Sequence, residues 1–543
     1  MVPHRSAPRV RTAFTVISFA TIATVAGQDS NQAFTLPERA AIYAYGYHGR
    51  AYKLDAGPHL FVDWRYVYPG RSRYTYQGRG IPRDRPAEYT SEINDVIRSD
   101  PKDAPYGIRI ELVKPEKHGP VVKNDQPWEY FTPYVTLLHY EGKYRLYYNT
   151  TTFLKDRSSL GYMVCYAEST DGIQYEKPRL GQVEFDGSTA NNIVLGPGVC
   201  RYGIHGPAIF VDPHGEPEER FKAVYQAAVD RKVVEELRKE RPESVTMAVH
   251  GADVGIMAAV SPDGIRWREL EQPVMGHVSV TGTTVYWDEK LQRYVGYFRM
   301  GVLGRRMIGR SETEDFRRWP HPEMILWPMP SDPPWVDYYT NGKSMYPGTK
   351  TMHLMFPMIY YRNVDTSIMR MASSLDGRVW NFLPGGPALE PGSEGEFDGG
   401  CIFPGAGLAE TADNRVILPY IGFAVPHKFP RLSPLGEVGL AVWPKQRLGA
   451  IVADEDGSFV THSFQTEGRS LWLNFETPRG GSVRVEVVGK EGRGLGDCDP
   501  LFGNHLEQEV TWRGEPDLGV SPADSFQLRF RLRNAKLFSF EFR

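Results

Sequence analysis

The sequence Ser169-Thr-Asp171-Gly172-Ile-Gln-Tyr175 decides the fold, because variants of it recur along the chain. Asp-Gly suits a tight hairpin in which the glycine takes a positive φ, and the Ser or Asp side chain can hydrogen-bond the turn backbone. The aromatic residue at the end begins the next strand. The other copies are Ser261-Pro-Asp263-Gly264-Ile-Arg-Trp267, Ser311-Glu-Thr-Glu-Asp315-Phe-Arg-Arg-Trp319, Ser374-Leu-Asp376-Gly377-Arg-Val-Trp380 and Ala453-Asp454-Glu-Asp456-Gly457-Ser-Phe459.

Each copy follows a strand-like segment, with further strand candidates upstream. Gly161–Glu168 precedes the first copy, and Tyr134–His139 and Tyr144–Asn149 come before it. Strand, turn, strand, loop, strand, Asp-Gly, strand is the order of a four-stranded propeller blade. Five copies therefore predict an all-β fold with a five-bladed β-propeller over residues 120–460. A β-sandwich with long hairpins is the alternative. A six-bladed sialidase is excluded, because its Asp-box has a residue between Asp and Gly.

The regions on either side of the repeat also contain strand candidates. Residues 461–543 include Ser470–Phe475, Ser482–Val488 and Phe526–Arg533, which predict a small C-terminal β-sandwich. Residues 28–119 are expected to form an N-terminal β segment that closes the propeller or completes the sandwich. Inside the repeat, Val229–Arg241 has the apolar spacing of a short surface helix.

The first 27 residues read as a signal peptide. Four basic residues between His4 and Arg11 are followed by the apolar stretch Thr12–Ala26 and by the small residues Ala26 and Gly27. The apolar stretch is too short to span a membrane comfortably, and no later segment is apolar for long enough. We therefore expect a secreted or periplasmic protein without a membrane span.

Charge and cysteine usage narrow the class of protein further. A formal net charge of -3 gives no reason to expect nucleic acid or an anionic membrane as partner. The four cysteines are too few and too scattered for a disulfide scaffold, and their spacing fits no zinc motif. Buried free thiols are expected at Cys165, Cys200, Cys401 and Cys498.

Position within the repeat separates structural carboxylates from candidate catalytic ones. Asp171, Asp263, Asp376 and Asp456 lie in the Asp-Gly copies and are expected to form turns. Polar residues near the start of each innermost strand face the opposite end of the channel. Among these, the candidate catalytic carboxylates are Asp337, Glu129 and Asp398. Because Asp337 lies among aromatic residues, we expect its pKa to be raised.

The same face carries the candidate substrate-binding residues. Trp and Tyr side chains can stack on sugar faces, while Arg, Asn and His can hydrogen-bond them. The candidates are Trp128, His205, Arg299, Trp335, Tyr339, Asn341, Arg362 and His427. No His-x-His or His-Glu-x-x-His spacing supports a catalytic metal, so we expect no cofactor. A lone structural Ca²⁺ in the channel is left open.

The chain resembles the five-bladed β-propeller glycoside hydrolases of the invertase and arabinanase superfamily, and in particular bacterial proteins labelled family 32-like. The resemblance covers the propeller and the C-terminal sandwich. Asn124-Asp125-Gln126-Pro127 is similar to the Asn-Asp-Pro-Asn-Gly that opens the first invertase blade. The Arg-Asp-Pro and Glu-Cys signatures of those enzymes are absent, so no family residue is carried over.

The resemblance implies a carbohydrate substrate and a glycosidase. That reaction uses one carboxylic acid to protonate the leaving oxygen and one carboxylate as nucleophile or base. Two alternatives remain. A non-catalytic glycan-binding propeller is favoured if the carboxylates are far apart or paired with Arg. A propeller polysaccharide lyase would use Tyr339 with His205 or His427 to take a proton.

Overall fold

The computed structural model describes residues 51–70, 103–152, 161–201, 203–246, 253–429 and 433–543, together with the backbone of β3 (Ser72–Tyr76), β4 (Arg79–Gly80) and β5 (Asp95–Ser99). The predicted signal peptide lies outside the described residues. The described chain is nearly all β, as the sequence predicts, with one α-helix, α3 (Arg231–Glu240). This helix lies where the sequence places one, and it buries Val234 and Leu237.

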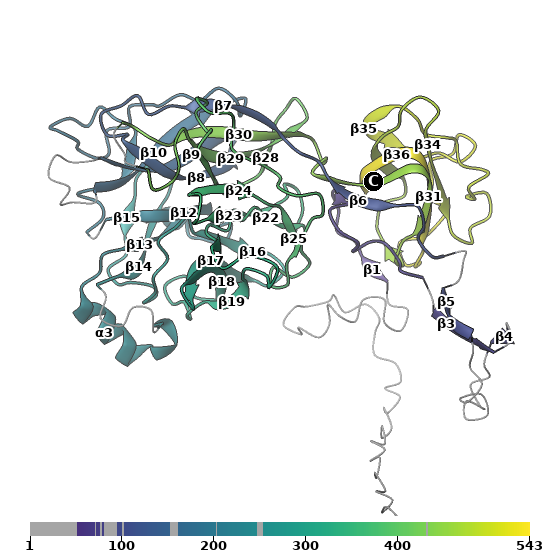
Figure 1. Cartoon of the computed structure of the whole chain (residues 1–543), viewed down its shortest axis with the longest axis horizontal. Helices are drawn as coiled ribbons and strands as arrows, with labels where there is room; N and C mark the ends of the chain where they lie inside the picture. The colour runs from purple at the N-terminus through teal and green to yellow at the C-terminus, as the bar shows by residue number, and fades with distance from the viewer. Residues whose placement is uncertain are drawn as a thin grey trace, which may run out of the picture.

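Residues 131–326 form three successive antiparallel sheets, which we call the first to third sheet units (Figure 1). Their strands, listed in chain order, are β8 (Phe131–Tyr140), β9 (Lys143–Thr152), β10 (Gly161–Ser169) and β11 (Ile193–Leu195); β12 (His205–Val211), β13 (Phe221–Ala227), β14 (Gly255–Ser261) and β15 (Arg268–Glu269); β16 (Thr284–Asp288), β17 (Arg293–Val302), β18 (Arg305–Thr313) and β19 (Glu323–Leu326).

The fourth sheet unit is interrupted across its width, so it consists of two sheets. One contains β20 (Val336–Tyr338), β23 (Met358–Tyr361) and β24 (Thr366–Met369); the other contains β21 (Lys343–Met345), β22 (His353–Met355), β25 (Ala372–Ser374) and β26 (Asn381–Phe382). The fifth unit contains β27 (Cys401–Pro404), β28 (Ala409–Glu410), β29 (Arg415–Phe423), β30 (Glu437–Pro444) and β7 (Glu116–Val122). Neighbouring units are in contact, and β27 of the fifth unit contacts β8 of the first.

The Asp-Gly turns form as predicted in three units. In the first, the Ser169 hydroxyl accepts a hydrogen bond from Gly172 N at 2.9 Å, and Asp171 Oδ1 accepts from Ile173 N at 2.8 Å. The same bonds occur at Asp263 and Asp376. In the degenerate copy, Asp315 Oδ1 likewise accepts from Arg317 N, but the Ser311 hydroxyl donates to the Pro320 carbonyl. These carboxylates therefore form turns.

The fifth predicted turn, at Asp456, is wrong. Asp456 lies inside β31 (Gly449–Val460) and is paired with Arg533 of β36 (Leu528–Phe542). The fifth unit has no hairpin at this place because its outermost strand comes from the other end of the repeat. Val438 and Leu440 of β30 pair with Val122 and His118 of β7. In Figure 1, β7 runs from the C-terminal part of the molecule to the edge of β30.

The C-terminal part is a seven-stranded sheet built around the long strand β36. This strand pairs with β31, β33 (Leu471–Glu476), β34 (Ser482–Val487) and β2 (His59–Leu60); β35 (Asn504–Glu509) joins through β33, and β6 (Arg109–Leu112) through β31. The predicted strands around residues 470 and 482 are present. The N-terminal segment thus contributes to both parts of the molecule, since β6 extends the C-terminal sheet and β7 the fifth unit. Elsewhere, β1 (Tyr52–Lys53) pairs with β32 (Phe464–Gln465) in parallel.

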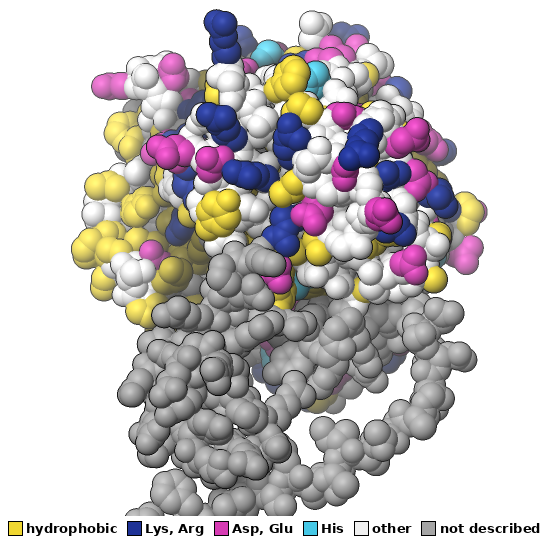
Figure 2. Space-filling view, turned by 90° about the vertical axis from the view of Figure 1, so that its right-hand side faces the viewer, with side chains coloured by type: hydrophobic (Ala, Val, Ile, Leu, Met, Phe, Trp, Pro, Cys, Tyr) yellow, Lys and Arg dark blue, Asp and Glu magenta, His cyan; other side chains and the backbone are white. Residues whose placement is uncertain are grey.

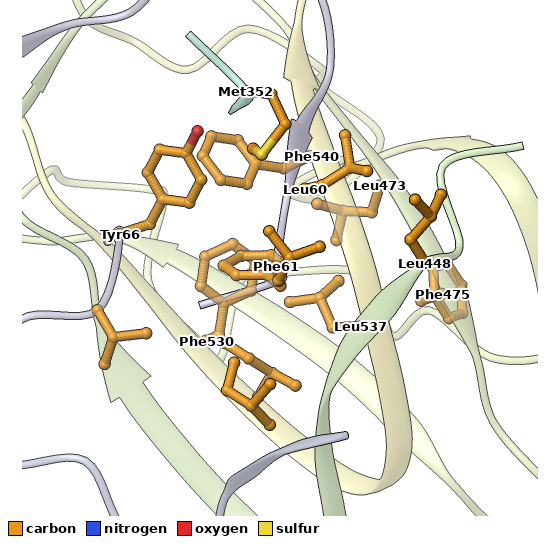
Figure 3. Close-up of a cluster of buried hydrophobic side chains, with 14 of the residues drawn as sticks. Leu60, Phe61, Tyr66, Met352, Leu448, Leu473, Phe475, Phe530, Leu537 and Phe540 are labelled. Carbon is orange, nitrogen blue, oxygen red and sulfur yellow. The ribbon is translucent and has the colours of Figure 1, made fainter. Parts of the chain in front are cut away.

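One hydrophobic cluster links the two parts. Phe61 is fully buried beside Phe530 and Phe540 of β36, and Met352 of the fourth unit lies in the same cluster (Figure 3). Next to it, Arg65 donates to the carbonyl oxygens of Thr351 and Ser374. The segment from β2 to Arg65 therefore packs between the C-terminal sheet and the fourth unit and holds the two together.

The surface and the cysteines agree with the composition. Figure 2 shows acidic and basic side chains interspersed on the face that it presents, without a large area of one sign. The four cysteines are free and buried, as expected from their spacing. Over the described ranges, no helix is long and apolar enough to cross a membrane.

The turns give a test of the packing between units. Gly264 and Gly142 both have positive φ, 79° and 73°. A Cβ at Gly264 would overlap the Tyr147 hydroxyl and lie 2.9 Å from the Phe221 ring, whereas a Cβ at Gly142 meets nothing within 4 Å. We expect Gly142→Ala to cost about 1 kcal/mol of unfolding free energy through backbone strain, and Gly264→Ala about 2 kcal/mol more through overpacking. Urea denaturation measures both; equal losses would contradict the tight interface.

Candidate functional site

Side chains from all five sheet units meet where the innermost strands come together. We call this group the central cluster. Its members are Tyr134 of β8, Tyr162 of β10, His205 of β12, Thr281 before β16, Arg299 of β17, Arg306 of β18, Tyr339 after β20, Tyr360 of β23, Phe403 of β27 and His427 after β29.

Aromatic and imidazole rings packed edge to face around His205 and at a tilt around Phe403 build the wall of the cluster. The His205 ring lies 5.3 Å from the Tyr134 ring and 4.9 Å from the Tyr162 ring. On the other side, the Phe403 ring lies 5.6 Å from Tyr339 and 4.9 Å from His427. Such packing fixes ring orientation and leaves the polar ring atoms pointing in defined directions.

Tyr339 and His427 form a polar pair inside the cluster. The Tyr339 hydroxyl is 3.4 Å from His427 Nε2. The loop that carries His427 is held by the β23–β24 hairpin: His427 N donates to the Asp365 carbonyl, and Lys428 N donates to Asp365 Oδ2 at 2.6 Å. A phenol and an imidazole at this separation can pass a proton between them.

Two guanidinium groups lie over the Tyr339 ring. Arg299 Cζ is 5.3 Å and Arg306 Cζ 4.8 Å from the ring centroid. Burial lowers the pKa of Arg299, and the nearby Tyr339 and Tyr134 oppose that shift. Burial and Arg299 together lower the pKa of His205 to about 3, so this imidazole is neutral at physiological pH. The cluster is therefore cationic because of its arginines.

The predicted catalytic Asp337 is a buried ion-pair partner. It lies on β20 without side-chain exposure and accepts from Arg362 Nε at 2.6 Å and Nη2 at 2.7 Å, and from Arg306 N at 2.9 Å. Burial raises its pKa, but the hydrogen bonds from Arg362 and Arg306 outweigh burial, and the net pKa is lowered. The expected raised pKa is therefore wrong, because arginines from β18 and the β23–β24 hairpin contact the carboxylate.

Glu129 and Asp398 have the same kind of surroundings. Glu129 accepts from Lys177 Nζ at 2.6 Å and from the Tyr148 hydroxyl at 2.5 Å. Asp398 accepts from the Tyr420 hydroxyl at 2.9 Å and is 2.8 Å from Lys117 Nζ of β7. Both side chains are inaccessible. The three predicted carboxylates thus have three separate sets of partners in the described chain, and none presents its oxygens to a ligand.

The eight predicted binding residues divide into three groups. His205, Arg299, Tyr339 and His427 belong to the central cluster. Trp335 and Arg362 lie on the rim: Trp335 is 44% exposed, and its carbonyl accepts from Arg362 N. Trp128 and Asn341 lie elsewhere in hydrogen-bonded positions: Trp128 Nε1 donates to Asn192 at 3.0 Å, and Asn341 joins the third and fourth units through the Thr284 hydroxyl.

Several members of the cluster were not among the predicted site residues. Three of them, Tyr134, Tyr162 and Phe403, fall within strands of alternating apolar residues, so the sequence predicts them to be core residues. Arg306 follows Arg305 directly, and no local pattern distinguishes the two. The available signal was their position on innermost or neighbouring strands. In the described ranges, no group of three or more His, Cys, Asp or Glu side chains is arranged to hold a metal ion.

Comparisons with known proteins return structures only. No protein-family model and no curated protein match the chain. A solved structure described as a glycoside hydrolase is 13% identical with a TM-score of 0.42, covering 61% of this chain and 92% of its own. An N-acetylgalactosamine deacetylase from F. plautii, in complex with blood group B trisaccharide, is 13% identical with a TM-score of 0.42, covering 62% and 95%.

An exo-inulinase from Aspergillus awamori is 12% identical with a TM-score of 0.39, covering 78% of this chain and 99% of its own. These structures include the class of enzyme that the sequence resemblance names. Similarity at this level carries no activity to the present chain, so the function is argued from its own side chains.

The ion pairs of Asp337 give a test by substitution and pH. Asp337→Asn leaves Arg306 and Arg362 without their carboxylate and should cost about 2 kcal/mol of unfolding free energy. Because the folded-state pKa of Asp337 is below its ordinary 3.8, this stabilisation is complete above that value and is lost as pH falls through the folded-state pKa. The difference in thermal stability between wild type and variant should therefore become smaller as the pH falls below the ordinary carboxyl pKa of 3.8.

The control is Glu314→Gln, which removes an exposed ion pair with Arg293. We expect it to change stability by less than about 0.5 kcal/mol. A difference between wild type and Asp337→Asn that stays constant down to low pH would show that the carboxylate is not held ionised by the arginines.

Proposed function

We propose that the protein is a secreted glycoside hydrolase that cleaves a glycosidic bond of an oligo- or polysaccharide at the central cluster. One observation carries the proposal: the Tyr339 ring lies under the guanidinium groups of Arg299 and Arg306, and its hydroxyl is 3.4 Å from His427 Nε2. A pair able to transfer a proton and positive charge thus lie together where all five sheet units meet. Aromatic rings around the pair match the apolar faces of sugars.

The proposed chemistry follows from the two groups of the pair. Hydrolysis needs a proton donor at the leaving oxygen and a nucleophile or base at the anomeric carbon, and some glycosidases use a Tyr nucleophile in place of a carboxylate. The guanidinium groups over the Tyr339 ring would stabilise the negative charge that develops on its oxygen during the attack. In the proposed reaction His427 accepts the Tyr339 proton as the Tyr339 oxygen attacks the anomeric carbon, and a water molecule on the opposite face of the sugar protonates the leaving oxygen. When the resulting hydroxide displaces the Tyr339 oxygen from the sugar, the imidazolium returns its proton to that oxygen.

The architecture proposed with this function is a five-bladed propeller with a C-terminal β-sandwich. The cyclic contacts of the five sheet units support the propeller, and the four partners of β36 support a folded two-layer sheet. We further propose that the reaction needs no cofactor, since the side chains of the pair and a water molecule can carry the proton transfers. A chelator should then leave the rate unchanged.

Elimination by a polysaccharide lyase is the second candidate. It is favoured by the inaccessibility of Asp337, Glu129 and Asp398 together with the Tyr339–His427 pair. A Tyr or His base would take the proton from the carbon beside a sugar carboxylate, and the leaving oxygen would depart as a double bond forms. The products separate the candidates, because hydrolysis adds water and elimination leaves an unsaturated sugar.

Tyr339→Phe tests the proposal. On the substrate found by screening plant and algal glycans, this variant should reduce kcat by about 10²–10⁴-fold, because the proton-transfer group is lost while the ring remains. The matched control is Tyr338→Phe, since the Tyr338 hydroxyl donates to Asp332 outside the cluster. Mass spectrometry of the products gives the reaction type. Near-normal activity of Tyr339→Phe would overturn the mechanism, and binding without cleavage by wild type would favour the glycan-binding alternative.

Secretion is proposed from the N-terminal sequence. The basic residues before Arg11, the apolar stretch Thr12–Ala26 and the small residues that follow fit a cleavable signal. Expression of the full chain in a bacterial host should give a mature protein in the periplasm or medium that lacks about the first 27 residues. Mass spectrometry of the purified protein measures this. An intact segment from Met1 to Ala26 would contradict export by this route.

A further inference from the structure

We propose that the central cluster recognises an acidic carbohydrate, and that Arg299 binds the anionic group of the sugar. The inference rests on the proposed function, in that it places the sugar in the same cluster. It adds the substrate class and the residue that selects it. The observations that carry it are a buried guanidinium without an ion pair and a buried imidazole nitrogen without a hydrogen bond, both among the residues that the structure describes, and a rim rich in arginine.

Arg299 is the first of these observations. Its guanidinium lies over Tyr339, largely buried, and forms no ion pair with any carboxylate of the described chain. The groups that act electrostatically on it are Tyr339, which also hydrogen-bonds it, Tyr134 and Arg306, none of which is a carboxylate. A buried charge is costly unless an opposite charge meets it. Because the chain supplies no such charge among these neighbours, a ligand carboxylate or sulfate fits the place.

His205 is the second observation. Its Nδ1 is buried and has no hydrogen-bond partner in the described chain. Burial and Arg299 keep the imidazole neutral, so one tautomer offers an N–H donor at this atom. The Thr281 hydroxyl, 1% exposed, lies beside Tyr134 in the same cluster. A neutral donor next to a cation suits an anion whose other oxygens need hydrogen bonds.

The rim adds charge of the same sign. Arg306 and Arg362 share the single carboxylate of Asp337. Arg305 donates to the carbonyl oxygens of Val336 and Pro333 and forms no ion pair in the described ranges. Asp332, which accepts from Tyr338, and Asp365, which accepts from Tyr360, lie on the same face. With Asp337 they are three carboxylates against the four arginines, so a small excess of positive charge remains, and Arg299 is the arginine deepest in the cluster. A chain of acidic sugars is attracted to such a face over several residues.

Exposed apolar side chains lie next to these arginines. Trp335 is 44% exposed and its carbonyl is bound to Arg362 N, while Leu303 and Val364 lie at the tips of the hairpins on either side of Arg362. An exposed indole and the guanidinium groups of the same rim can each contact a sugar ring that carries a negative group. The rim therefore offers neighbouring positions to an extended acidic glycan rather than to a small inorganic anion.

Calorimetric titration of the full-length mature protein tests the inference. The probes are oligogalacturonate and alginate oligosaccharides, which carry carboxylates, carrageenan oligosaccharides, which carry sulfates, and neutral galactan oligosaccharides. At least one acidic probe should bind more tightly than the neutral one. Arg299→Gln should weaken that binding by about 10–100-fold, the scale of losing a hydrogen-bonded charge pair. The carboxylate and sulfate arms identify the anionic group.

The control is Arg370→Gln, which removes a guanidinium 4.0 Å from the Phe382 ring outside the cluster. It should leave binding unchanged. Arg299→Lys keeps the charge without the planar fork and should retain part of the affinity. Melting temperatures identify any variant that fails to fold. If Arg299→Gln does not fold, the affinity of Arg299→Lys for the acidic probe is compared with that of wild type, and an unchanged affinity would contradict the inference.

The outcomes separate this inference from the proposed function. If acidic probes bind no more tightly than neutral ones, or if Arg299→Gln binds them as wild type does, the inference is overturned. Cleavage of a neutral glycan that is unaffected by Arg299→Gln would overturn it too and leave the proposed function in place. Tight, Arg299-dependent binding of an acidic probe without cleavage would support the inference and overturn the proposed activity.

Discussion

The main-chain pairing of β7 with β30 is the constraint on which the rest of the structure depends. The fifth sheet unit has no outer strand of its own. Without β7, the backbone N–H and C=O groups along the edge of β30 from Val438 to Val442 would be exposed to solvent. Because β7 comes from the N-terminal side of the repeat, its pairing joins the two ends of the chain of sheets. It also carries Lys117 to Asp398, so the closure places a charge beside the entrance of the last innermost strand.

A second consequence of this closure is the close contact of β27 with β8. The central cluster needs this contact, because Tyr134 comes from the first unit and Phe403 from the fifth, with ring centroids 6.1 Å apart. Tyr339 and His427 are likewise brought together by the fourth and fifth units. The cluster is therefore a product of the whole cycle, and no single unit contains enough of it to work alone. The same dependence explains how a site can be built from strands that are far apart in sequence.

The sequence allowed three Asp-Gly turns and the buried thiols to be predicted, because those features are local. It also named four residues, His205, Arg299, Tyr339 and His427, that the structure brings together in the central cluster. Ser169, Asp171 and Gly172 make their turn from within four residues, so their spacing alone predicts it. The turn at Asp456 failed because the partner of that segment, Arg533, is set by a long-range pairing. The lowered pKa of Asp337 was not predicted for the same reason. Arg306 and Arg362 contact its carboxylate from other strands, and residue spacing along one sequence does not reveal such contacts.

The burial of the three carboxylates has a physical logic that joins stability to function. Each lies near the start of an innermost strand, where the sequence expects chemistry, but each is matched by a cation or a phenol and is closed to solvent. Asp337 holds Arg306, whose guanidinium lies over Tyr339, so its contribution to the site is the position of that charge. Within the described ranges Arg299 has no such counterpart. The described residues thus neutralise the carboxylates at the edge of the cluster and leave one cation at its centre unmatched, an arrangement that stabilises the fold less than a complete ion pair and favours an anionic ligand.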